Sequence, residues 1–247
     1  MPNRAAALAF AALAATAACH SGSSPARTQD LMTAVGTAGA SMREGAQAGP
    51  WRSLVDGSSL AAWRGYKSDT VPAGWSADGG VLSKARPVRD IVTRDEYGDF
   101  ELSLEWKISE GGNAGVFYRG TEEYDHIYWS APEYQLLDDD KAPDGKNPLT
   151  RAATDYALYP RMAGTLKPVG EWNETRIVVK GAHVEHWLNG EKTVDYTLWS
   201  DDWKAKVAGS KFKDWPNYGL ARRGHIALQG DHAGTLAFRN IKIRELR

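Results

Sequence analysis

The chain has 247 residues, of which 42% are hydrophobic and 25% charged, a composition typical of a globular protein with a sizeable core. Its 30 basic and 31 acidic residues give a net charge of -1, so no basic excess is present to neutralise phosphates. Nucleic acid is therefore excluded as a predicted partner. The one cysteine, Cys19, excludes an internal disulfide and a cysteine-clustered zinc site.

The N-terminus has the pattern of an export signal. Arg4 supplies a positive charge, residues 5–15 form an apolar core too short to span a bilayer, and small residues follow. Cys19 comes next, where a bacterial lipoprotein carries its lipidated cysteine. We expect a signal peptide at residues 1–18 and an exported protein. It is either an outer-membrane lipoprotein, anchored in the membrane through Cys19, or a periplasmic protein with a simply cleaved signal.

Residues 19–50 contain mostly Ser, Ala, Gly and Thr, with almost no large apolar side chain. Such a segment cannot bury enough surface to offset the entropy lost on ordering. The composition therefore predicts a flexible tether here and a folded domain over residues 51–247.

Alternation of apolar and polar residues predicts that this domain is all-β. In residues 100–106, Phe, Leu, Leu and Trp share one face, and Asn189-Gly190 is the dipeptide typical of a tight hairpin. About ten short strands with Gly or Asp turns favour a two-sheet antiparallel jelly-roll sandwich. The strands are expected at 75–76, 81–83, 91–93, 100–106, 115–119, 176–180, 183–188, 192–196, 224–229 and 235–243.

Two segments depart from this pattern. Asp201–Phe212 predicts one short helix, because Ser200 or the next residue can cap it and Trp203 and Val207 lie four apart. Residues 130–172 predict one long loop. Its aromatic and Leu content indicates that the loop is ordered, as a wall or lid beside a site.

Generic catalytic motifs give little guidance, because the sequence has no nucleophile elbow, P-loop or helical zincin signature. The run Asp138–Asp140 can hold a calcium ion or form a solvated turn. Ten Trp and ten Tyr are a stronger indication, since aromatic rings stack on sugars while carboxylates and amides bind their hydroxyls.

Several short strings resemble one family in their order along the chain. They are Gly115–Arg119, Pro132–Asp139, Ala157–Tyr159, Gly170–Asn173, His186–Gly190, Ser210–Phe212 and Gly224–His232. Together they resemble the 3-keto-disaccharide hydrolase-like domain family over residues 51–246. The resemblance implies a concanavalin A-like jelly roll in an exported bacterial protein. Residues 229–232 read Gln-Gly-Asp-His, one residue longer than the family's usual Gln-Asp-His, which shifts His232 relative to Gln229.

The resemblance also implies a substrate, a glycoside whose sugar is already oxidised to a ketone at carbon 3. The ketone acidifies the proton on carbon 2, so a modest base can form an enediolate that expels the aglycone from carbon 1. Water can add later, giving net hydrolysis, so hydrolase and lyase end points stay open. Such a site needs a base near carbon 2, an acid near the glycosidic oxygen, and a donor or cation at the carbon-3 oxygen.

These roles can be placed on the motif positions. Glu133 or His232 is the predicted acid–base residue, and Arg119 is predicted to hold the keto oxygen or a hydroxyl. The predicted substrate-binding residues are Gln135, Tyr159, Gln229, Asp138 and His186. Asp138 and Asp139 are the predicted ligands of a divalent cation such as calcium, and whether a metal takes part stays open.

A noncatalytic carbohydrate-binding module on the cell envelope is the alternative function, because jelly rolls serve both purposes. A binding module needs aromatic platforms and hydrogen-bonding groups but no buried group with a shifted pKa. The polar set of Arg119, Glu133, Gln135 and Asp138 favours the enzyme, with an oxidised sugar as its partner.

Overall fold

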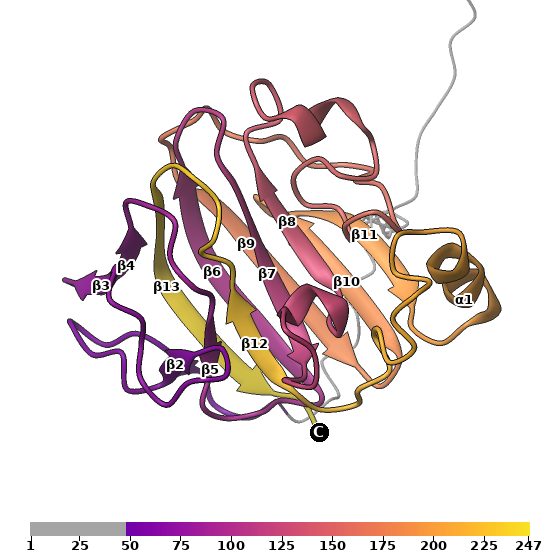
Figure 1. The fold of residues 1–247 in the computed structure, drawn as a ribbon, viewed down its shortest axis with the longest axis horizontal. Coiled ribbons are helices and arrows are strands. Elements are labelled where there is room, and N and C mark those ends of the chain that lie inside the picture. The colour runs from indigo at the N-terminus through magenta and orange to yellow at the C-terminus, as the bar shows by residue number, and fades with distance from the viewer. Residues whose placement is uncertain (1–47) are drawn as a thin grey trace, which may run out of the picture. The chain divides into compact units, whose positions relative to one another are not determined.

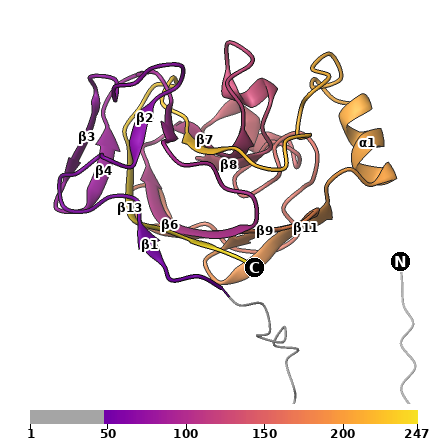
Figure 2. The ribbon, with the colours of Figure 1, turned by 90° about the horizontal axis from the view of Figure 1, so that it is seen from below.

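A computed structural model describes residues 48–247, and they form two antiparallel sheets packed face to face (Figures 1 and 2). The predicted signal peptide, Cys19 and the tether up to residue 47 lie outside the described residues. Ala48 bridges Leu246, and the Gly49 N–H donates to the Glu245 carbonyl at 2.8 Å. The folded part therefore includes residue 48, three residues before the predicted boundary.

The larger sheet has eight strands. They are β1 (Arg52–Ser53), β3 (Trp75–Asp78), β4 (Val81–Lys84), β6 (Phe100–Ile108), β9 (Asn173–Lys180), β10 (His183–Leu188), β11 (Glu191–Thr197) and β13 (Leu236–Glu245). Their order is β11-β10-β9-β6-β13-β4-β3, and β1 also pairs with β13.

The smaller sheet has five strands in the order β2-β5-β12-β7-β8. They are β2 (Trp63–Gly65), β5 (Ile91–Thr93), β12 (His225–Leu228), β7 (Asn113–Gly120) and β8 (Glu133–Leu137). Figure 2 shows β7 and β8 in one layer and β6, β9 and β11 in the other. The prediction of an all-β, two-sheet jelly-roll sandwich is confirmed.

The core lies between the two sheets, because each strand turns alternate residues toward the other sheet. In β6, Leu102, Leu104 and Trp106 are buried in this core. The smaller sheet contributes Val116 from β7 and Leu136 from β8. Residues of β7 and β8 that point the other way are thus available to form a site on the outer face of the smaller sheet.

The two irregular segments also have the predicted character. Helix α1 (Asp201–Ala208) is capped by the Ser200 hydroxyl, which accepts from the Trp203 N–H at 3.1 Å. It ends at Ala208, four residues earlier than expected, and Gly209 is its C-cap. A short 3-10 helix, η1 (Ile127–Trp129), precedes the predicted long loop. The loop is ordered and contains strand β8 and a second 3-10 helix, η2 (Pro143–Lys146). None of the helices among the described residues is long and apolar enough to cross a membrane.

Candidate functional site

Three residues form a row across adjacent strands of the smaller sheet. Gln229 follows β12, and its N–H donates to the carbonyl of Gly115 in β7 at 3.0 Å. Gly115 in turn pairs with Gln135 in β8. Their neighbours Ala114 and Leu136 face the core, so the row faces the opposite side, away from the larger sheet.

Glu133 lies over the middle of this row, on the same face of β8 as Gln135. A Cβ at position 115 would overlap the Glu133 carboxyl group, so a glycine is needed for the close approach. Glu133 is only 7% exposed. Burial raises the pKa of Glu133 to about 8, an effect that Lys211 opposes and Asp155 reinforces. The carboxyl group therefore holds its proton at neutral pH.

The row and Glu133 form the floor of a cavity of about 230 Å³. Its walls are Asn113, Tyr128, Asp144, Tyr156, Lys211, Asp231 and His232. Asp144 and Tyr156 come from the segment 130–172, which thus forms one wall of this cavity.

Two amide oxygens on the floor lack partners. The Oε1 atoms of Gln135 and Gln229 are buried and accept no hydrogen bond from residues 48–247. The two residues are 1% and 6% exposed, respectively. A buried carbonyl oxygen without a donor costs free energy, about 1–3 kcal/mol. A ligand that carries hydroxyl groups would supply the missing donors.

Lys211 provides the one ammonium group among the cavity's lining residues. Its Nζ lies 4.1 Å from the centre of the Tyr156 ring, a cation–π contact. Partial desolvation lowers the pKa of Lys211, although its side chain is exposed, while the charges of Glu133 and Asp144 raise it. The Lys211 ammonium thus lines the same cavity as the buried Glu133 carboxyl group.

Two more buried carboxyl groups surround Glu133. Asp155 lies between the sheets, completely buried, and neither of its oxygens makes a hydrogen bond of good geometry with another described residue. Burial raises the pKa of Asp155 to about 8, although the Tyr196 hydroxyl and the Glu133 N–H lower it. Asp90 accepts from the Gly230 N–H at 2.8 Å, and burial raises its pKa to about 7. Both groups raise the pKa of Glu133.

Comparison with known proteins assigns the chain to a family. The family of 3-keto-alpha-glucoside-1,2-lyase-like domains matches residues 50–244. The chain belongs to this family. It is 34% identical over 225 residues to a 3-keto-disaccharide hydrolase of Bacteroides thetaiotaomicron, covering 78% of this chain and 77% of that protein.

Solved structures of related proteins support the fold. One protein of Parabacteroides distasonis, provisionally described as a glycosyl hydrolase, has 33% identity and a TM-score of 0.75. The match covers 80% of this chain and 94% of that one. A second structure from the same organism, described in the same way, has 31% identity and a TM-score of 0.64, covering 80% and 100% of the two chains.

Arg119 lies outside the cavity in this family member, which corrects the prediction that it holds the keto oxygen. It is in β7 with Gly115, but the register against β12 shifts beside it and its φ is 52°, so it leaves the alternation. Its guanidinium donates to the carbonyls of Gly98 (3.0 Å) and Gly181 (2.9 Å) and to Asp99 (3.1 Å). Arg119 therefore ties loops together at the far end of the strand.

Tyr159 and His186 are also away from the cavity, so their predicted role in substrate binding is corrected. The Tyr159 hydroxyl donates to Asp202 at 2.7 Å. His186 is completely buried between the sheets, 2.9 Å from the Tyr118 hydroxyl, and burial lowers its pKa to about 3. Its side chain points to the core because it lies on the inner face of β10.

Asp138 and Asp139 accept hydrogen bonds that organise the long loop. Asp138 accepts from the Gly111 N–H at 2.8 Å and from two N–H groups of its own turn. Asp139 accepts from the Ala152 N–H at 2.7 Å and pairs with Arg161 at 3.0 Å. These residues line a larger cavity of about 680 Å³. We place the site in the smaller cavity, because that one gathers the unpartnered and protonated groups.

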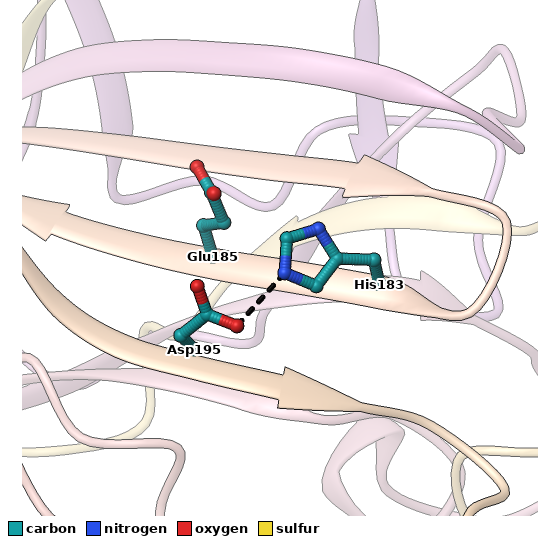
Figure 3. A group of neighbouring side chains, drawn as sticks. All are labelled: His183, Glu185 and Asp195. Atoms are coloured by element: carbon teal, nitrogen blue, oxygen red, sulfur yellow. Dashed lines mark hydrogen bonds and ion pairs between the residues drawn. The ribbon is translucent and has the colours of Figure 1, made fainter. Parts of the chain in front are cut away.

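Within residues 48–247, one group of His, Asp and Glu side chains has metal-ligand spacing. The donor atoms of His183, Glu185 and Asp195 lie within 4.8 Å of one another (Figure 3). The Lys192 ammonium already contacts Glu185 at 3.1 Å and Asp195 at 2.6 Å. This lysine neutralises the carboxylates, so the group carries no case for a metal.

Sequence reasoning missed several residues of the site. Lys211 and Asp231 lie inside two of the strings that resemble the family, Ser210–Phe212 and Gly224–His232. Their place in these strings is the signal that could have identified them. Tyr156 follows Asp155 in an aromatic stretch of the long loop. Asp90, which does not line the cavity but raises the pKa of Glu133, had no signal beyond preceding a short apolar run. Of the predicted site residues, the structure brings together Glu133, Gln135, Gln229 and His232.

Proposed function

We propose that the protein cleaves glycosides whose sugar carries a ketone at carbon 3, in the cavity on the outer face of the smaller sheet. The observation that carries this proposal is the buried, protonated Glu133 beside the Lys211 ammonium, above two unpartnered amide oxygens. Membership of the family and the likeness to a 3-keto-disaccharide hydrolase support the substrate class.

The reaction begins with removal of the proton on carbon 2. His232 is the base, because an imidazole nitrogen can accept a proton and this side chain lines the cavity. The electron pair of the broken C–H bond moves toward carbon 3, giving an enediolate with negative charge on the former keto oxygen. Lys211 stabilises that charge, the role first assigned to Arg119.

Collapse of the enediolate forms a double bond between carbons 1 and 2 and breaks the glycosidic bond. Glu133 gives its proton to the departing aglycone oxygen, for which a carboxyl group protonated at neutral pH is suited. Gln135 and Gln229 accept hydrogen bonds from sugar hydroxyls through their free oxygens. Addition of water to carbon 1 completes net hydrolysis.

A chromogenic 3-keto-glucoside tests the proposal, with the unoxidised glucoside as the matched substrate. We expect aglycone release from the keto substrate alone, since only its carbon-2 proton is acidic enough for a modest base. Binding of the keto-sugar without any release would instead indicate the noncatalytic carbohydrate-binding module. Equal release from both substrates would contradict ketone-assisted cleavage.

Replacing Lys211 by methionine should lower kcat for the keto substrate by about 10²–10³, because the enediolate loses its countercharge. Lys211→Arg keeps the charge and should recover part of this loss. Steady-state kinetics measure both variants, with Lys213→Met, two residues along and exposed, as the control. An unchanged kcat in Lys211→Met would remove Lys211 from the mechanism.

A further inference from the structure

The loop of residues 229–235 connects β12 to β13 and carries part of the cavity wall. Gln229, Asp231 and His232 all line the cavity. The side chains of Asp231 and His232 are both 43% exposed, and His232 Nε2 lies 3.7 Å from Asp231 Oδ1. Their side-chain contacts are thus too weak to fix their positions, which must be set through the backbone of the loop.

One buried charge holds the far half of this loop. Lys84, the last residue of β4, is only 3% exposed, and its Nζ donates to the His232 carbonyl at 2.6 Å and to the Gly234 carbonyl at 3.3 Å. It forms no salt bridge within residues 48–247. A buried ammonium is costly unless hydrogen-bonded, so these two loop carbonyls account for its burial.

A second buried polar group, the Asp90 carboxyl, holds the near half. The Asp90 carboxyl accepts from the Gly230 N–H at 2.8 Å, and the Val88 N–H donates to the Gly230 carbonyl at 2.9 Å. A Cβ at position 230 would lie 2.6 Å from the Val88 carbonyl oxygen. The loop therefore lies tightly against the segment 88–90, with no space for a side chain at residue 230.

We propose that Lys84 and Asp90 are positioning residues, which clamp the loop 230–234 from both sides and so place His232 in the cavity. Neither side chain lines the cavity, so neither is a catalytic residue. The proposal rests on the proposed function for the role of His232. It adds that the position of this base depends on two buried groups on other strands or loops, far away in the sequence.

Kinetics of Lys84→Met test the clamp, since methionine keeps the length of the side chain and removes its donors. We expect kcat for the 3-keto-glucoside to fall about tenfold to a hundredfold, because small displacements of a reacting group are costly. Lys84→Arg keeps donors and charge and should restore part of the rate. Lys204→Met, on the exposed face of α1, is the control and should leave the rate unchanged.

A double-mutant cycle separates positioning from general destabilisation. In a His232→Ala background, Lys84→Met should cause no further loss of rate, because the residue that it positions is already absent. If the double variant instead loses rate by the product of the two separate losses, Lys84 does not act through His232 and the proposal is wrong.

Hydrogen exchange gives a readout that does not depend on activity. Amides of residues 230–235 should exchange faster in Lys84→Met and in Asp90→Asn, while those of β6 keep their protection. Unchanged exchange in the loop would overturn the clamp, whatever the activity. Faster exchange in a protein that cleaves no keto-glycoside would support the clamp and refute the proposed function instead.

Discussion

Replacing Glu133 by glutamine is expected to lower kcat/KM for cleavage of a 3-keto-glucoside by about 10²–10⁴. Glutamine keeps the shape of the side chain over Gly115 but cannot give a proton to the leaving aglycone. The loss should be largest for alkyl aglycones, which leave poorly as anions, and smallest for nitrophenyl aglycones, which need little protonation. Rates of the two substrate types, measured in wild type and variant, check the expectation.

The pH dependence of kcat/KM gives a second, independent test of Glu133 as the acid. Because burial raises the pKa of Glu133 to about 8, wild-type kcat/KM for alkyl aglycones should fall as pH rises through that value. The fall should be absent from Glu133→Gln. Glu191→Gln, exposed at the start of β11, serves as the control. An equal loss for alkyl and nitrophenyl substrates would mean that Glu133 is not the acid.

Replacing Asp155 by asparagine is expected to make the protein more stable in alkaline solution. Burial raises the pKa of Asp155 from 3.8 to about 8, so between these values the folded state holds a proton that the unfolded state has lost. Stability therefore falls as pH rises over this range, and the loss is complete above the folded pKa. At about 1.4 kcal/mol per pKa unit, the loss is on the order of several kcal/mol.

Urea unfolding at about pH 5 and about pH 9 measures this effect. The free energy of unfolding should fall less in Asp155→Asn than in wild type, since the amide does not ionise. The free energy of unfolding of Asp155→Asn should still fall somewhat, because burial also raises the pKa values of Asp90 and Glu133. Asp214→Asn, at an exposed position, should follow wild type. Parallel losses in Asp155→Asn and wild type would show that Asp155 is ionised in the folded protein.

The sequence predicted the parts of the site that depend on strand periodicity. Glu133 and Gln135 are two apart, so they share a face of any strand that contains them. The same rule separates His183 from His186, which lie on opposite faces of β10. Such inferences succeed because side-chain alternation follows from the backbone of each strand alone.

Predictions failed where the backbone leaves this regular pattern. Arg119 has the right spacing from Gly115, but its left-handed backbone and the shifted register turn it away. Asp138 and Asp139 form an acidic run, yet one oxygen of each accepts from a backbone N–H remote in the sequence, that of Gly111 and that of Ala152 respectively. Neither a local bend nor a distant hydrogen-bond donor is visible in the sequence around a residue.

The sequence by itself determined the all-β character of this protein, the faces of its strands, and the family strings that carry Glu133, Gln135 and Gln229. Only the tertiary structure decided which face of the smaller sheet holds the cavity and which remote side chains complete it. Lys211 arrives from beyond α1, and Lys84 and Asp90 reach the loop of His232 from other strands or loops. The physical reason is burial: the protons on Glu133 and Asp155 depend on how much water the packed sheets and loops exclude.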